Sequence, residues 1–229
     1  HDYCAAEIVQ KVMMPRDSIS EELAGIAHDT DFNLREIPAA TALTDAVSVI
    51  RFGAIDRRED TSDALYPILS KLAELGLKGV WNESQQKFED QLLQQRVDHY
   101  RKEKAKKMRK ALASHCDSII HDRLVRVVEI PSGVTSTDMG TFASIQENLE
   151  FDGKSLKVAD LLLMLSQGGM LGIRRGSETV LCNKAAKLFN GGGHPFAAGG
   201  EYGLYENFQA VCDDLFLTLS KSKEWLAEF

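Results

Sequence analysis

The spacing of apolar residues predicts helices at the start of the chain. Apolar positions recur every three or four residues from Tyr3 to Met14 and stop at Pro15, which is the pattern of one amphipathic helix. A second segment starts near Ser18 or Ser20, and either hydroxyl can cap a helix there. We expect residues 1 to about 80 as a whole to alternate helix and short strand.

A long uninterrupted segment follows. From Ser84 to Ser114 the chain contains no Gly or Pro, and most apolar residues fall on one helix face. This pattern predicts a connector helix over 84–114, between a first lobe at 1–83 and a second at 115–229. The expected fold class is α/β, with two α/β lobes joined by the long helix.

The second lobe begins with a β-branched run and then mixes both kinds of pattern. We expect a C-terminal lobe in which a small mixed sheet packs with helices. The elements predicted are a strand at Leu124–Ile130, a helix after a loop through Ser136–Asp138, another helix at Val158–Leu165, a strand at Met170–Arg174, a short helix at Asn183–Phe189 and a mostly helical end at Leu204–Ala227.

Charge is unevenly distributed along the chain. The 229 residues carry a net charge of −7, yet Arg101 to Lys110 holds seven basic residues and one acid. Such a stretch can steer a polyanionic substrate, although a solvated helix face is its commoner meaning. Only Tyr100 among the few aromatic residues lies beside it, so no extended base-stacking surface is indicated. Short oligonucleotides therefore fit this chain better than long strands.

Cysteines and apolar runs exclude several other classes. The four cysteines lie far apart and form no C-x-x-C pair, which excludes a zinc knuckle and a dithiol redox motif. They are most simply reduced thiols, so we predict a cytoplasmic protein. No apolar run approaches the roughly 20 residues that a bilayer span needs, so we predict no membrane partner.

The most informative stretch is a glycine block at Asn190–Gly200. Three consecutive glycines after a helix exceed what a helix end requires, because one glycine suffices there. Backbone N–H groups without side chains around them can approach an anion closely, and His194 directly after them can donate to the same phosphate. A flexible turn is the ordinary meaning of such a run. The block matches neither the Walker A pattern nor the dinucleotide G-x-G-x-x-G pattern.

The order of elements around the block favours the phosphate interpretation. A strand ending in Arg174 and Arg175, a short strand at Thr179–Leu181, the helix at Asn183–Phe189 and the sequence Gly-Gly-Gly-His-Pro-Phe-Ala-Ala-Gly-Gly together resemble the C-terminal domain of the DHH phosphoesterase family. That family includes nanoRNase-type oligoribonucleases, phosphoadenosine-phosphate phosphatases, cyclic-dinucleotide phosphodiesterases and RecJ-type exonucleases. The resemblance is specific over residues 168–200 and weaker over the rest.

The resemblance implies a substrate grip in the second lobe. In such proteins the glycine-histidine loop and a strand arginine hold the phosphate or terminal nucleotide of the substrate. Arg175 is the less favoured arginine, since alternation along a strand points it to the other face. The matching positions, taken as substrate-binding residues, are Arg174, Gly191, Gly192, Gly193 and His194.

The resemblance also implies a metal ligand in the first lobe. The segment Ala24–Phe32 resembles the family's last metal-binding motif, in which an aspartate follows a small apolar helix. Asp29 is the matching position, so we expect it to be a catalytic metal ligand. Two manganese ions are implied, and Mg²⁺ suits the same hard ligands. Without the family, an aspartate at a helix end is most often a cap or turn residue.

The earlier metal motifs of the family are missing from these residues. Neither an Asp-x-Asp strand end nor the Asp-His-His triplet occurs in the chain. The segment Cys4–Val9 resembles the helix that follows the triplet in relatives. We therefore expect the chain to be a fragment that lacks most of its metal ligands.

These observations predict a manganese-dependent phosphodiesterase that hydrolyses short oligoribonucleotides or nucleotide phosphates. Its expected partner is short single-stranded RNA or a nucleotide phosphate, and a homodimer is left open. Two alternatives remain. One is a single-strand-specific exonuclease on longer DNA or RNA, and the other is a non-catalytic nucleotide-binding protein that kept the phosphate loop.

Overall fold

The computed structural model describes residues 3–32, 34, 36–151 and 153–227. The chain divides into two compact units, His1–Glu103 and Lys104–Phe229. Helix α5, Gln91–Ala113, contains the boundary between them. Within the described part of the chain, no helix is both long enough and apolar enough to cross a membrane.

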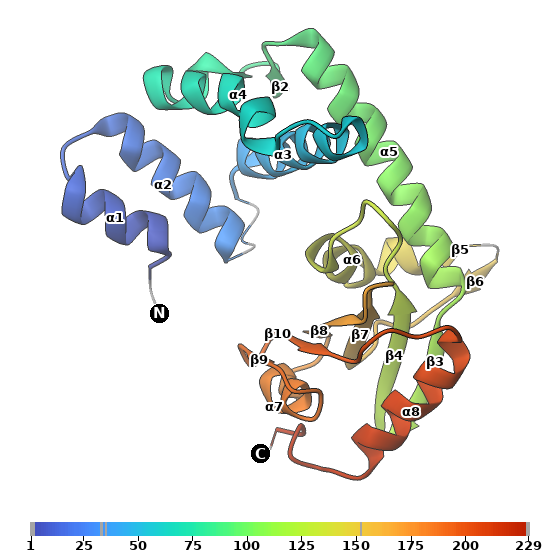
Figure 1. Ribbon diagram of the computed structural model, residues 1–229. Helices are drawn as coiled ribbons and strands as arrows, with labels where there is room; N and C mark the ends of the chain where they lie inside the picture. The colour runs from blue at the N-terminus through green and yellow to red at the C-terminus, as the bar shows by residue number, and fades with distance from the viewer. Residues whose placement is uncertain (1–2, 33, 35, 152, 228–229) are drawn as a thin grey trace. The chain divides into compact units, whose positions relative to one another are not determined.

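The first unit is helical apart from one small hairpin. Strands were expected among residues 1–80, and this expectation is wrong for the part of that range that the structure describes. Small residues explain the difference, because the alanines of α3 are almost fully buried and let neighbouring helices pack closely around it. The elements are α1 Ala5–Met13, α2 Ser18–Asp31, α3 Pro38–Arg57, α4 Thr61–Leu75, the 3₁₀ turn η1 Leu77–Gly79, β1 Trp81–Asn82 and β2 Lys87–Phe88 (Figure 1).

Side-chain caps set where these helices begin. Asp17 caps α2 by accepting from the backbone N–H of Ser20, and Asp60 caps α4 in the same way. Asp90 accepts from the N–H groups of Leu92 and Leu93, so α5 starts at Gln91. The expected start of this helix at Ser84 is wrong because the chain first turns through the β1–β2 hairpin, where Trp81 and Phe88 pack edge to face 5.3 Å apart.

The second unit is built on a six-stranded mixed sheet with the order β3-β4-β7-β8-β10-β9. Strands β4 and β7 run parallel, and the other neighbours run antiparallel. Its elements are β3 Cys116–Ile120, β4 Arg123–Glu129, α6 Ser136–Ala143, the 3₁₀ turn η2 Gln146–Leu149, the small hairpin of β5 Glu150–Phe151 and β6 Lys154–Ser155, β7 Leu161–Leu165, β8 Met170–Arg175, α7 Cys182–Lys187, β9 Gly192–Gly193, β10 Ala197–Glu201 and α8 Phe208–Ser220.

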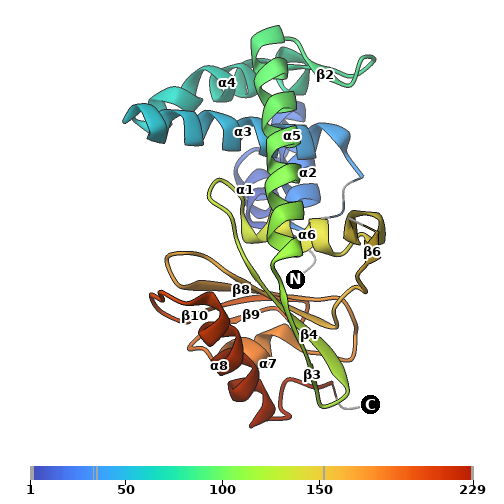
Figure 2. The same cartoon turned by 90° about the vertical axis from the view of Figure 1, so that its right-hand side faces the viewer.

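Helices cover both faces of this sheet (Figures 1 and 2). On one face α7 and α8 pack against alternate residues such as Leu163 and Ile173, which are fully buried. On the other face α6 and the last turns of α5 pack against Met164. Alternate side chains of each strand thus pack into two separate cores, one on each face of the sheet. Each fully buried leucine contributes roughly 1.5–3 kcal/mol to folding.

Strand β7 corrects the helix expected at Val158–Leu165. Leu161–Leu165 is buried at every position because β7 lies in the middle of the sheet with helices on both faces. A strand buried on both faces loses its alternating pattern and cannot be distinguished from a short buried helix by periodicity alone. Thr179–Leu181 also differs from expectation, since Val180 makes only an isolated bridge to Leu226.

Three further elements of the second unit agree with the sequence: the strand at Leu124–Ile130, the strand at Met170–Arg174 and the short helix before the glycine block are present within a residue or two of their expected bounds. The helix expected after Asp138 already begins at Ser136, and strands β3, β9 and β10 were not expected. The mixed α/β class is confirmed.

Candidate phosphate-binding site

The glycine block folds into a tight hairpin. β9 and β10 pair with Gly192 opposite Gly199, and His194 and Ala197 exchange both backbone hydrogen bonds, at N···O distances of 2.7 and 3.3 Å. This exchange leaves a two-residue loop of Pro195 and Phe196. The block is therefore part of the sheet edge instead of a free loop.

The three consecutive glycines have different roles in this hairpin. A side chain at Gly191 would collide with the backbone of Gly199 and Gly200, and a Cβ at Gly193 would lie 2.7 Å from the Cα of Ala198. At Gly192, by contrast, nothing lies within 4 Å of an added Cβ. Gly191 and Gly193 are thus required for packing, whereas the space above Gly192 is open to a ligand.

The N–H groups of the glycines do not all face an anion. The N–H of Gly191 donates to the carbonyl of Ala186 at 2.9 Å. In an antiparallel ladder, hydrogen-bonded and non-bonded pairs alternate, so the exchange at His194 leaves the N–H of Gly193 on the outer edge of β9. One backbone donor, instead of the expected cluster of three, is then available from the block.

Sheet register brings Arg174 and His194 to the same face. Arg174 pairs with Ala197, and Ala197 pairs with His194. Directly opposed residues of antiparallel strands point to the same side, so these two side chains project from one face, two strand spacings or about 10 Å apart. It is the face that α6 covers. Alternation sends Arg175 to the opposite face, where its Nη2 lies 4.0 Å from a carboxylate oxygen of Glu178.

Glycines and small residues clear the path of the Arg174 side chain. A Cβ at Gly140 of α6 would lie 2.7 Å from its Cγ, so only glycine lets the aliphatic stem pass there. The guanidinium Nη2 then donates to Thr137 Oγ1 at 3.2 Å. Thr137 lies in the first turn of α6, whose N-cap Thr135 forms a capping box with Asp138.

The charge on Arg174 is not compensated by a carboxylate in the described part of the chain. No ion pair among the described residues includes Arg174, and its guanidinium donates a hydrogen bond to the neutral hydroxyl of Thr137. Burial lowers the pKa of Arg174, although an arginine remains charged. A half-buried guanidinium without an acidic partner is the arrangement that an incoming anion stabilises.

A second arginine on the same face shows the contrast. Arg126 is 1% exposed, and it binds Asp117 through two hydrogen bonds of 2.8 and 2.7 Å and the carbonyl of Lys157 through a third. It pairs with Leu162, which pairs in turn with Arg174. Arg126 is fully satisfied inside the protein, which gives it a structural role, whereas Arg174 has no carboxylate partner among the described residues and is a candidate for binding a ligand.

Asp29 lies in the last turn of α2 and is 4% exposed. Its Oδ1 accepts from the backbone N–H groups of Glu36 and Ile37 at 2.8 and 3.1 Å, immediately before Pro38 begins α3. The carboxylate therefore holds the start of α3. One oxygen of the expected metal ligand already has two donors.

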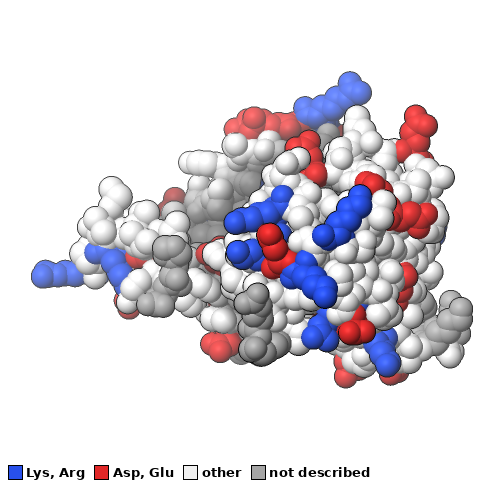
Figure 3. All heavy atoms as spheres, turned by 90° about the horizontal axis from the view of Figure 1, so that it is seen from below, with Lys and Arg blue, Asp and Glu red and all other residues white. Residues whose placement is uncertain are grey.

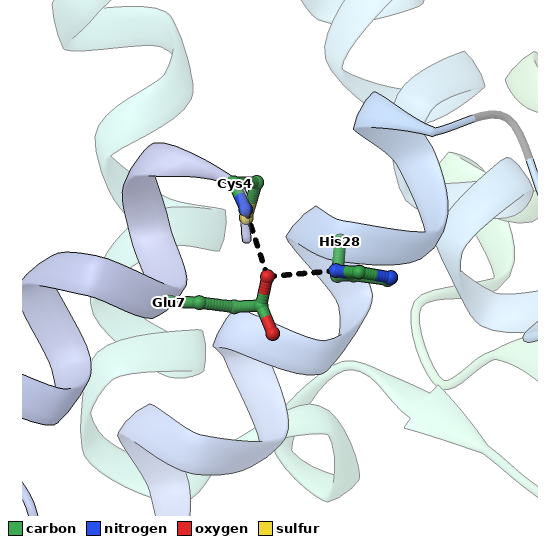
Figure 4. A group of neighbouring side chains, drawn as sticks. All are labelled: Cys4, Glu7 and His28. Atoms are coloured by element: carbon green, nitrogen blue, oxygen red, sulfur yellow. Dashed lines mark hydrogen bonds and ion pairs between the residues drawn. The ribbon is translucent and has the colours of Figure 1, made fainter. Parts of the chain in front are cut away.

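Cys4, Glu7 and His28 are the described side chains that come closest to a metal centre (Figure 4). Their ligand atoms lie within 4.8 Å of one another. Glu7 Oε2 accepts from the N–H of Cys4 at 2.8 Å and lies 2.7 Å from Nδ1 of His28, and the bond to His28 lowers the pKa of Glu7. These contacts explain the cluster as a structural contact that joins α1 to α2.

The described residues do not fit a pair of manganese ions. Manganese prefers carboxylate, carbonyl and water oxygen, whereas the Cys4 cluster offers a thiol, one imidazole and one carboxylate that is already hydrogen-bonded. It is the only group of three or more ligand side chains in the part of the chain that the structure describes. Asp29 adds one further carboxylate, which is too few oxygen ligands for two ions.

Three of the seven basic residues in the stretch on α5 contact neighbouring residues. Arg101 binds the buried carboxylate of Asp45 at 2.7 Å, Lys104 binds Asp138 at 2.8 Å, and Lys107 donates to a backbone carbonyl. Figure 3 shows one face of the protein, on which several Lys and Arg side chains gather with acidic side chains among them. The three engaged residues of α5 are less available to a long nucleic-acid strand.

Two residues beside Arg174 and His194 escaped the sequence analysis. Thr137 is only one of several hydroxyl residues at the start of α6, and its contact with Arg174 depends on how α6 packs on the sheet. Phe196 lies inside the glycine block, where its stacking on His194 required the hairpin geometry. Aromatic residues within a glycine-rich block are the sequence signal that could have drawn attention to Phe196.

Comparison with known proteins gives matches only among solved structures. No family model matches the chain, and no curated protein matches it. An exopolyphosphatase-related protein from Bacteroides fragilis is 21% identical with a TM-score of 0.36, and covers 69% of this chain and 43% of its own. An uncharacterized protein from Helicobacter pylori G27 is 14% identical with a TM-score of 0.36, covering 94% and 65%.

A pGpG-specific phosphodiesterase from Vibrio cholerae is 11% identical with a TM-score of 0.49, and covers 94% of this chain and 73% of its own. The chain thus spans from less than half to about three quarters of the length of these structures. At such low similarity, the chemistry of the site has to come from the residues of the chain itself.

Proposed function

We propose that this chain provides the substrate-binding part of a phosphoesterase that hydrolyses short oligoribonucleotides or nucleotide phosphates. The observation that carries the proposal is the half-buried Arg174, which lacks a carboxylate partner in the described structure and shares one sheet face with His194. Open space above Gly192 lies on the same face, because Gly192 pairs with Gly199 and Gly199 pairs with Gly172.

Each residue has a distinct task in this proposal. The Arg174 guanidinium supplies positive charge and two parallel donors to a phosphate, held in place by its bond to Thr137. His194 supplies an imidazole donor, and Gly193 supplies a backbone N–H from the sheet edge. Gly192 leaves the room that a phosphate oxygen needs. The sheet fixes these positions, so little ordering is required on binding.

Hydrolysis is proposed to depend on manganese, with Asp29 as one ligand. Metal ions would activate water and neutralise the charge that develops on the phosphoryl oxygens. Replacing Asp29 with Asn should abolish manganese-dependent hydrolysis of a ribodinucleotide while leaving nucleotide binding intact. Near-normal hydrolysis by the Asp29→Asn variant would remove Asp29 from the ligand set.

The binding half of the proposal is tested on the 229-residue chain itself. Titration with adenosine 5′-monophosphate, followed by amide chemical shifts, should perturb residues around Arg174 and His194. Arg174→Gln should weaken binding about 10- to 100-fold, the scale of a hydrogen bond to a charged group. Arg175→Gln is the matched control on the opposite face and should change the affinity less than about twofold. Equal effects of both substitutions would reject the site.

A non-catalytic nucleotide-binding protein is the second candidate. It is favoured by Asp29, whose Oδ1 is already occupied by two backbone donors. The two candidates give the same binding result and differ only in turnover, so manganese-dependent hydrolysis by the parent protein separates them. Exonuclease action on long strands is the least favoured function, because Arg101 and Lys104 of α5 are paired with carboxylates inside the protein.

A further inference from the structure

Phe196 occupies the tip of the β9–β10 hairpin and is 48% exposed. It follows Pro195, whose ring fixes the backbone φ of the first loop position. Large exposed aromatic rings on a proline-stiffened turn lose little conformational freedom when they bind a flat partner. The side chain is thus presented to solvent on a rigid support.

Two hydrogen bonds fix the hairpin tip against neighbouring elements. The carbonyl of Pro195 accepts from the N–H of Cys182 at 2.8 Å, which joins it to the start of α7. The carbonyl of Phe196 accepts from the N–H of Arg175 at 3.4 Å, which joins it to β8 directly beside Arg174. The distance between the Phe196 backbone and the Arg174 backbone is therefore set by the sheet.

The rings of Phe196 and His194 are stacked. Their centroids lie 5.2 Å apart and their planes differ by 7°. This offset parallel arrangement is one that aromatic pairs favour, and it gives both rings a common orientation. A third flat ring can extend such a stack, because every nucleobase has a π-face and stacking tolerates any base.

We propose that the His194–Phe196 pair is a nucleobase platform, so that the ligand of the Arg174 face is a nucleotide and not an inorganic phosphate chain. The inference rests on the proposed function and adds the base-binding part of the same site. His194 and Arg174 are about two strand spacings apart, comparable with the length of one nucleotide. Phosphate bound by Arg174 then places its own base within reach of Phe196.

Three probes separate the base from the phosphate in a binding experiment on the 229-residue chain. Adenosine 5′-monophosphate carries phosphate, sugar and base; ribose 5-phosphate lacks the base; inorganic triphosphate lacks both base and sugar. Phe196→Leu keeps apolar bulk and removes the aromatic face, whereas Phe196→Trp keeps the face. Leu204→Ala is the matched control, because Leu204 is an 85% exposed apolar residue of the same unit.

We expect Phe196→Leu to weaken binding of adenosine 5′-monophosphate about 5- to 150-fold, as loss of one base–aromatic stack does. Binding of ribose 5-phosphate should not change. The tryptophan variant should retain the nucleotide affinity, and its additional fluorescence should be quenched by adenosine 5′-monophosphate but not by ribose 5-phosphate. Leu204→Ala should behave as the parent chain with all three probes.

Failure of the platform can be distinguished from failure of the phosphate site. If adenosine 5′-monophosphate and ribose 5-phosphate bind equally, and Arg174→Gln weakens both while Phe196→Leu weakens neither, the platform is rejected and the phosphate site stands. Inorganic triphosphate binding more tightly than the nucleotide would also reject the platform. If none of the probes shifts residues near Arg174, the proposed function itself fails.

Discussion

The end of α2 and the α6-covered face of the sheet both carry residues expected to bind substrate or metal, yet the two regions are built differently. At the end of α2, Asp29 is nearly buried and accepts hydrogen bonds from the start of α3. On the sheet, Arg174 is aligned with His194 by strand register and has no acidic partner among the described residues. One group is satisfied within the fold and the other is not.

The difference follows from what a phosphate site and a two-metal centre each require. A phosphate grip needs one cation, one or two donors and open space, all of which a sheet edge can position through its backbone ladder. A two-metal centre needs several carboxylates that converge from different elements. The first requirement is met within one unit, and the second is not met by the described residues.

The largest expected effect on stability tests the structural role of Arg126. Asp117→Ala removes the only carboxylate that pairs with the buried Arg126 in the described structure, and breaking one partner of a buried ion pair costs about 3–5 kcal/mol. The free energy of unfolding in urea should fall by this amount. A loss below about 1 kcal/mol would mean that Arg126 finds water or another partner when Asp117 is removed. The pairing with Asp117 would then not distinguish Arg126 from Arg174.

The next effect separates the glycines that pack from the glycine that faces a ligand. Gly191→Ala should destabilise the chain by about 1–3 kcal/mol, because the added methyl group meets backbone atoms of β10. Gly192→Ala should leave stability within about 0.5 kcal/mol, since the space there is open.

Gly192, which matters little for stability, should matter strongly for phosphate binding. Gly192→Val keeps the fold but fills the space over the sheet, so binding of adenosine 5′-monophosphate should be lost while the circular dichroism spectrum stays that of the parent. Parent-like binding by Gly192→Val would make the glycine block only a turn.

The second unit was largely predictable from sequence because its signals are local. The β-branched run of β4 and the short helix α7 fold as their own residues dictate, whereas the strand pairing of the glycine block was not expected. Strand β7 was mistaken for a helix because burial on both faces erased its alternation. The sequence does not connect His115 and Asp117 with Arg126, since these residues meet only when β3 pairs with β4.

The first unit shows what local pattern cannot supply. Strands were expected where alanine-rich helices pack, because small apolar residues carry little periodic signal. Asp29 could be selected as a candidate, but the hydrogen bonds that it makes depend on how the chain turns from α2 into α3. The pairing of Arg174 with Ala197, and thereby its alignment with His194, likewise requires the sheet order.

Substitution of Asp29 should have a smaller effect on stability, and it tests whether the end of α2 is a structural turn. Asp29→Ala removes the acceptor for two backbone donors before α3 and should cost about 1 kcal/mol, as loss of a capping side chain does. Asp29→Asn keeps one acceptor oxygen and should lose less. If both variants are as stable as the parent in urea unfolding, the carboxylate is not needed for the turn, and a purely metal-binding role for Asp29 gains support.

The smallest effect is the pH dependence of the His115–Asp117 contact. The hydrogen bond to Asp117 raises the pKa of His115, and Nε2 of His115 lies 3.5 Å from Oδ2 of Asp117. A raised histidine pKa stabilises the fold below its ordinary value near 6.5, and this contribution is lost as the pH rises through the higher folded value. Burial opposes ionisation of Asp117, but the bonds from His115 and Arg126 prevail and lower its pKa to about 2, so Asp117 remains charged throughout this range.

Comparison of the parent with His115→Gln isolates this contribution. The difference in unfolding free energy should be less than about 1 kcal/mol at about pH 5.5, because the contact is partly exposed, and it should shrink at about pH 8.5. A difference that stays constant across this range would show that His115 acts through its neutral hydrogen bond to the carbonyl of Leu112, which does not depend on charge. Nucleotide binding at the Arg174 face should be unchanged in this variant, since His115 contacts the structural arginine pair and not the ligand-facing residues.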